Sequence, residues 1–136
     1  MDIQINREIC TALAEYNKGL EKNYGNVVLD APPVNKKYPL TVIQNIRDVA
    51  NANYNSCYGR VSSKGYKVHI YAQDKGKISR VVIAETIAKN VDDFLGRQVG
   101  LIRESYNSID LENEGTTLHI IMTYSGNLDE YRRKFI

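Results

Sequence analysis

Tyr66-Lys67-Val68-His69-Ile70-Tyr71-Ala72 is the stretch that decides the fold, because its side chains alternate in character from one residue to the next. The positions from Tyr66 to Ala72 taken in steps of two are apolar, and Lys67 and His69 stand between them. Successive side chains of a strand point to opposite faces of a sheet. The stretch therefore predicts a half-buried strand with one face toward a core and one face toward water.

Three more strands and two helices are predicted around this strand. β-branched residues gather at 40–47, and apolar residues alternate with polar ones at 99–106 and 116–124, with a turn at Asn113-Glu114-Gly115. An apolar stripe predicts a helix over 6–22 with Asn6 as its N-cap. A second stripe predicts a helix from Arg80 to Leu95, with Ser79 as N-cap and Gly96 as the stop.

The order of these elements predicts an α+β fold in a single domain. Strands that run as meanders on either side of a helix favour a mainly antiparallel sheet of about four strands, with two α-helices packed on one face. A chain of 136 residues is the size of one domain. We expect an N-terminal helix and proline-containing arm at 1–37, a sheet-helix core at 38–126 and a basic C-terminal tail at 127–136. The three asparagines of 51–56 predict an exposed loop.

Composition excludes several classes of protein. Apolar residues make up 43% of the chain and charged residues 25%, which is ordinary for a folded soluble domain. No apolar segment approaches the ~20 residues that a membrane-spanning helix needs, and the first residues have no secretory pattern, so we expect no membrane association and synthesis in a cytoplasm. A formal net charge of +2 is far from the strongly basic balance of a dedicated nucleic-acid binder.

The sequence offers no recognisable catalytic arrangement. His69 and His119 stand at alternating strand positions, where solvent-facing imidazoles are the expected reading. The acidic pair Asp92-Asp93 is expected to be solvated surface, and the two cysteines, Cys10 and Cys57, are expected to be free thiols. The glycines are scattered singly, without a phosphate-binding grouping. We therefore expect no enzyme, no cofactor and no metal site.

Two features bear on interactions. A series of basic and aromatic residues could stack on and neutralise a nucleic-acid strand, although on strands it is more often a wet sheet face: Tyr58, Arg60, Lys64, Tyr66, Lys67 and Tyr71. The chain also holds ten tyrosines against two phenylalanines, and tyrosine combines a large contact area with a polar tip. The tyrosine content favours assembly, and a small nucleic-acid-binding module stays as an alternative.

From Lys37 onward the chain resembles the tail-completion and tail-terminator proteins of long-tailed bacteriophages, a family also described as minor capsid or head-tail joining proteins. The residues that carry the resemblance are Tyr38-Pro39, the strand 67–71, the helix that ends on Asp92-Asp93-Phe94, Gly100-Leu101-Ile102-Arg103 and the strand end Met122-Thr123-Tyr124. Residues 1–37 do not match the pattern of the family.

The resemblance implies a structural virion protein rather than an enzyme. Such proteins form a ring, commonly a hexamer, that caps the tail tube at its head-proximal end, stops tube growth and joins the tail to the head. The implied partners are further copies of this chain, the tail tube protein and head connector proteins, with DNA passing through the lumen without tight binding. The implied location is the virion, in the tail or neck, after assembly in the bacterial host cytoplasm. A role as head-tail connector or minor capsid protein is the alternative within the same class.

The segments 23–39 and 48–65 are the candidate docking segments, because flexible arms of a ring subunit can dock on its neighbours. With the basic end of the chain, they supply the residues that we expect to contact neighbouring subunits, the tail or the head. These residues are Tyr24, Val34, Tyr38, Tyr54, Tyr58, Arg60, Lys64, Tyr131, Arg132 and Arg133.

Overall fold

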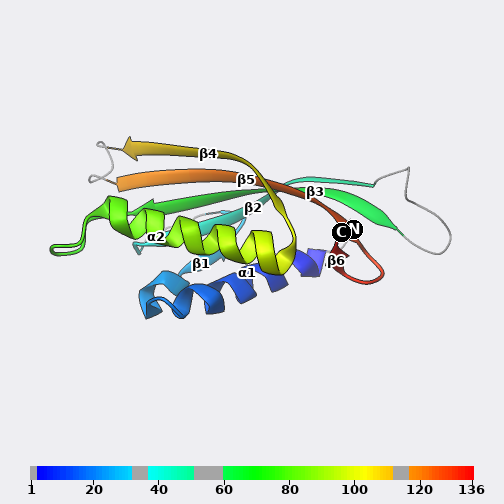
Figure 1. Cartoon of the computed structure of the whole chain (residues 1–136), viewed down its shortest axis with the longest axis horizontal. Helices are drawn as coiled ribbons and strands as arrows, with labels where there is room; N and C mark the ends of the chain where they lie inside the picture. Colours follow the sequence, from blue (N-terminus) through cyan, green and yellow to red (C-terminus); the bar gives the residue numbers. More distant parts are fainter. Residues whose placement is uncertain (1–2, 32–36, 51–59, 112–116) are drawn as a thin grey trace.

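The computed structural model describes residues 3–31, 37–50, 60–111 and 117–136. Figure 1 shows a long twisted sheet with the two α-helices side by side on one of its faces. The sheet has six strands, in the order β1-β2-β3-β5-β4, and β6 pairs with β5. The α+β class and the placement of both helices on one face agree with the sequence-based expectation. The expected asparagine loop and the turn at 113–115 fall outside the described residues.

The strands are longer and more numerous than predicted. They are β1 (Val27–Leu29), β2 (Leu40–Ala50), β3 (Val61–Ala72), β4 (Ile102–Leu111), β5 (Thr117–Asp129) and β6 (Lys134–Phe135). β1 runs parallel to β2. The other pairings are antiparallel, and they join β2 to β3, β3 to β5, β5 to β4 and β5 to β6. The sheet is therefore mixed but mainly antiparallel, as expected, and the expected number of about four strands is corrected to six. β1 lies in the segment expected to be a connecting arm, because three residues are too few to show a period of two.

The N-terminal helix, α1, spans Ile3–Lys18, and a short 3₁₀ helix, η1, follows at Lys22–Gly25. Asn6 is therefore inside α1, and its expected role as the N-cap is wrong. Its side-chain oxygen instead accepts a hydrogen bond from the Tyr66 hydroxyl at 2.7 Å. This contact joins the first half of α1 to the middle of β3.

The second helix, α2, spans Arg80–Asp93 and continues as a π-helical turn, η2, over Phe94–Val99. The Ser79 hydroxyl accepts a hydrogen bond from the backbone N–H of Val81 at 3.1 Å, which confirms Ser79 as the N-cap. Gly96 does not stop the helix. The stop is Gly100, whose φ of 91° lies in the left-handed region that favours glycine, and whose N–H bonds the Leu95 carbonyl at 3.0 Å.

One hydrophobic core fills the space between the helices and the sheet. Leu13 of α1 and Ile87 of α2 are completely buried, and they belong to the same cluster as Val68 and Ile120 from the central strands. Burying a large aliphatic side chain stabilises a fold by about 1.5–3 kcal/mol, so this layer is the main source of stability. Cys10 is a free, buried thiol at its edge, and Cys57 lies outside the described residues.

The last residues fold back instead of forming a solvated tail. β6 pairs with the end of β5, with Leu128 opposite Phe135. The Phe135 ring packs against the core and meets Tyr66 edge-on at 6.3 Å between ring centroids. Arg133 forms an ion pair with Glu8 of α1 at 2.9 Å. The C-terminal segment therefore ties β5 to α1.

Candidate interaction surface

One face of the sheet carries none of the described helices, and we call it the open face. Register and alternation define it: Val68 and Met122 are opposite each other and belong to the core, so their chain neighbours His69 and Ile121 point away from the helices. The open face continues onto β4 through Ile109, which is paired with His119. Among the described elements, both α-helices lie on the other side of the sheet (Figure 1).

Two histidines meet at the centre of the open face. His69 Nδ1 and His119 Nε2 are 2.9 Å apart, and the Tyr71 ring stacks on His119 with 4.2 Å between ring centroids. Burial lowers the pKa of His69 below 6.5, and the nearby Lys67 ammonium lowers the pKa further. A lowered pKa favours the neutral form of the His69 ring at pH 7, which suits a contact surface. The sequence predicted the face of each histidine, but their meeting depends on the β3–β5 register.

Both long edges of the sheet carry exposed aliphatic side chains. β4 is the last strand on one side, and Ile102 and Ile109 on it are 69% and 46% exposed. On the other side, β1 pairs with β2 at Thr41–Ile43, and no described strand lies beside Gln44–Ala50, so this part of β2 is also an edge, where Val49 is 56% exposed. Exposed strand edges that carry aliphatic side chains favour pairing with another chain.

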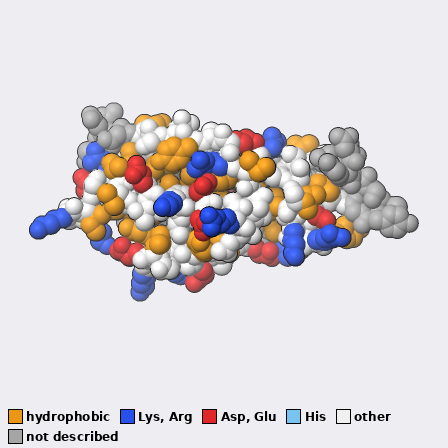
Figure 2. Space-filling model, viewed as in Figure 1, with side chains coloured by type: hydrophobic (Ala, Val, Ile, Leu, Met, Phe, Trp, Pro, Cys, Tyr) orange, Lys and Arg blue, Asp and Glu red, His pale blue; other side chains and the backbone are white. Residues whose placement is uncertain are grey.

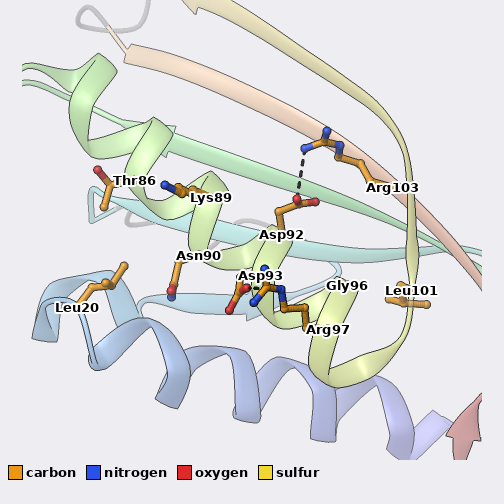
Figure 3. Close-up of a pocket in the computed structure, with 10 residues that line it drawn as sticks. All are labelled: Leu20, Thr86, Lys89, Asn90, Asp92, Asp93, Gly96, Arg97, Leu101 and Arg103. Carbon is orange, nitrogen blue, oxygen red and sulfur yellow. Dashed lines mark ion pairs between the residues drawn. The ribbon is translucent and has the colours of Figure 1, made fainter.

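An open groove of about 860 Å³ lies between the ends of the two helices and the start of β4 (Figure 3). Its centre holds Asp92, which accepts a hydrogen bond from the Tyr124 hydroxyl at 2.8 Å and pairs with Arg103 at 3.4 Å. Asp93 accepts a hydrogen bond from Tyr16 at 2.5 Å. Burial, followed by the Asp92 carboxylate, raises the pKa of Tyr124 strongly.

The groove is therefore held together by internal contacts. Both carboxylates are half-buried. Asp92 joins α2 to β5 of the sheet, and Asp93 joins α2 to α1, which corrects the expectation that they are plain solvated surface. Across the described residues, no group of three or more His, Cys, Asp or Glu side chains is arranged to hold a metal ion. No described helix is long and apolar enough to span a bilayer.

Lys64 does not belong to the outer surface of the chain. Its side chain is fully buried, and its Nζ lies 3.0 Å from an Asp48 carboxylate oxygen and 3.4 Å from the Asn6 side-chain oxygen. The neighbouring Tyr66 is buried on the same side of β3, toward the helices, whereas Lys67 and Tyr71 face the opposite way. The predicted basic and aromatic series is thus divided between two faces, which removes the continuous strip that a nucleic-acid strand would follow.

The other predicted docking residues are spread over the surface. Tyr24 packs partly against the core, and Tyr38 is half-buried beside β2. The exposed residues gather around the β5–β6 end of the sheet: Arg60, Tyr131, Arg132 and Arg133. Val34, Tyr54 and Tyr58 lie outside the described residues. Figure 2 shows acidic and basic side chains interspersed over the helix-covered side, without a broad patch of one sign.

Comparisons with known proteins find a likeness of fold. No protein-family model matches the chain, and no curated protein matches it. Among solved structures, it is similar to a chain described as "Virion of native gene transfer agent (GTA) particle", with a TM-score of 0.56 and 15% sequence identity. The match covers 91% of this chain and 97% of that chain. At this identity the comparison shows a shared fold over almost the whole length of both chains.

Proposed function

We propose that this protein is a structural component of a phage-like virion, where copies of it form a ring at the head-proximal end of the tail. The ring ends growth of the tail tube and joins the tail to the head. The observation that carries the proposal is the shared fold, over nearly the full length, with a chain of a gene transfer agent virion. The partners are further copies of this chain, the tail tube protein and the head connector.

The surface of the chain supports assembly over catalysis. The described charged groups of the helix face are largely paired with one another, as in the Asp92–Arg103 and Arg133–Glu8 pairs. The exposed aliphatic side chains on the sheet edges and the stacked rings of the open face are suited to contacts with other proteins. We infer that the chain is not an enzyme.

The near-neutral charge of each chain also suits a ring through which DNA passes. The formal net charge is +2, and phosphate binding strengthens with each basic group that contacts the backbone. A lumen with few unpaired basic groups lets DNA pass without holding it. Tight DNA binding by the purified protein at physiological salt would contradict this part of the proposal.

Deleting the gene from its parent phage or prophage tests the role directly. Electron microscopy of the lysate should show DNA-filled heads beside unattached tails of uncontrolled length. Heads that have lost DNA beside tails of normal length would instead assign the chain to the head connector, the second candidate. Normal virions would refute the virion role. A plasmid copy of the intact gene should complement the deletion, and the same plasmid with an early stop codon in the gene is the control.

A further inference from the structure

The geometry points to a specific contact between copies: β4 of one copy pairs with the part of β2 in the next copy that no described strand covers, so that their sheets become continuous. This inference rests on the proposed ring and names the surfaces that build it. The two edges lie at opposite sides of the sheet, as the strand order shows. Two different edges that meet head to tail give a heterologous interface, the type that closes into rings.

The backbone of both edges is available for pairing. β4 pairs with β5 on one side, and no described strand lies on its other side. β1 covers β2 only at Thr41–Ile43, so Gln44–Ala50 has no described strand beside it. On β4, the register is regular from Ser105 to Leu111, after a bulge between Arg103 and Ser105. β2 has a bulge of its own between Asn45 and Arg47, so its regular free segment is Arg47–Ala50. This segment and Ser105–Leu111 of β4 present N–H and C=O groups that no described strand pairs with.

The strand directions also fit an antiparallel contact between β4 and the β2 strand of a neighbouring copy. β2 is antiparallel to β3, β3 to β5 and β5 to β4, so β4 runs opposite to β2 within one copy. A neighbour related by rotation about an axis along the strands keeps its own β2 in the same direction. Its β2 therefore lies antiparallel to β4 of the first copy, and the alternation of the sheet continues across the contact.

Side chains on the two edges are complementary as well. Ile109 is opposite His119 and Val49 is opposite Ser63, and both registers place these residues on the open face. Pairing of β4 with the neighbour's β2 would put the exposed side chains of Ile109 and Val49 on the same side of the joined sheet. Ile102 and Ile46, which are also exposed, extend this apolar row on their own strands. Contacts between such cross-strand apolar pairs stabilise a sheet, and the row leaves water when the edges join.

The occupant of each edge is thus a second copy of this chain, and a pair of variants tests it. Ile109→Lys damages only the β4 edge, and Val49→Lys damages only the β2 edge; each variant places an ammonium group in the proposed contact. Both side chains are exposed in the single chain, so neither variant should disturb the fold, and far-ultraviolet circular dichroism checks this. Burying an unpaired charge at an interface should weaken association on the order of 100-fold.

The measurement is sedimentation velocity of the purified full chain at a concentration where the wild type forms rings. Each variant alone should sediment as a monomer. An equal mixture should form heterodimers, because the intact β2 edge of Ile109→Lys can pair with the intact β4 edge of Val49→Lys. These heterodimers should grow no further, because both of their remaining edges are damaged. Val82→Lys, at a similarly exposed position on α2, is the matched control and should form rings. Ile102→Lys and Ile46→Lys repeat the test if either first variant misfolds.

Other outcomes overturn the inference in distinguishable ways. Rings formed by both variants would mean that the contact uses other surfaces, while the ring itself stands. Self-association of the Val49 variant alone would mean that two β4 edges pair with each other. Two monomeric variants whose mixture stays monomeric, or a monomeric wild type at every concentration, would also reject the β4–β2 contact. The virion role is judged separately, by the phenotype of the gene deletion.

Discussion

The buried pair of Lys64 and Asp48 gives the sharpest test of the packing between sheet and helices. Lys64 Nζ is fully buried and lies 3.0 Å from Asp48, whose side chain is 14% exposed. Asp48→Asn removes the carboxylate and leaves the ammonium group in the core. Breaking a buried pair in this way typically costs 3–5 kcal/mol, and the partial exposure of Asp48 places the expected loss at about 3 kcal/mol.

The reverse change should cost much less. Lys64→Met removes the buried charge and keeps an unbranched apolar stem, while the Asp48 carboxylate retains access to water. We expect a loss of about 1 kcal/mol or less, since replacing buried ionic groups by apolar ones of similar volume is often neutral. The double variant Asp48→Asn with Lys64→Met should therefore be more stable than Asp48→Asn alone.

Urea unfolding at pH 7, followed by circular dichroism, measures these differences. With a slope of about 1.5 kcal/mol per molar urea, the Asp48→Asn midpoint should fall by about 2 M. Glu15→Gln, in the exposed pair with Lys18, is the control and should stay within about 0.5 kcal/mol of the wild type. A loss below 1 kcal/mol for Asp48→Asn, or a larger loss for Lys64→Met, would refute the argument.

Three further predictions concern the sheet and its surfaces. Tyr124→Phe removes the hydroxyl bonded to Asp92 and should lower the free energy of unfolding by about 1–2 kcal/mol, whereas the exposed Tyr131→Phe should have no effect in the same urea assay. The folded-state pKa of His69 lies below 6.5, so the unfolded chain binds more protons and stability should fall as pH drops below 6.5; His69→Gln should reduce this loss between pH 7.5 and 5. Wild-type rings should persist when sodium chloride rises from 0.1 to 0.5 M, since their contacts are apolar, and dissociation in sedimentation velocity would contradict this.

Periodicity made the central layer predictable from the sequence. The alternation over 66–72 and the two apolar stripes each record burial against one neighbour, so β3, α1 and α2 could be located before their partners were known. Boundaries were less accurate where tertiary contacts extend an element. β5 continues to Asp129 because β3 and β6 pair with its end, and no local signal in the sequence marks that partner.

The candidate surface was predictable only in part, for a different physical reason. The face of each strand residue follows from alternation, but the residues that meet across strands follow from register. The His69–His119 pair and the burial of Lys64 therefore appear only once β2, β3 and β5 are aligned. Lysine is almost never fully buried without a partner, and Asp48 is distant enough in sequence that composition gives no sign of the pair.

The two sides of this sheet differ in a way that bears on assembly. On the helix side, buried polar groups are tied together within the chain in contacts such as Tyr124–Asp92 and Tyr66–Asn6. At the edges, Val49 and Ile109 remain exposed beside backbone groups that have no described strand partner. Natural sheets usually protect such edges with charges, prolines or a covering segment. Exposed aliphatic side chains on both edges are a liability for a monomer, but they are expected of a subunit whose neighbours complete the sheet.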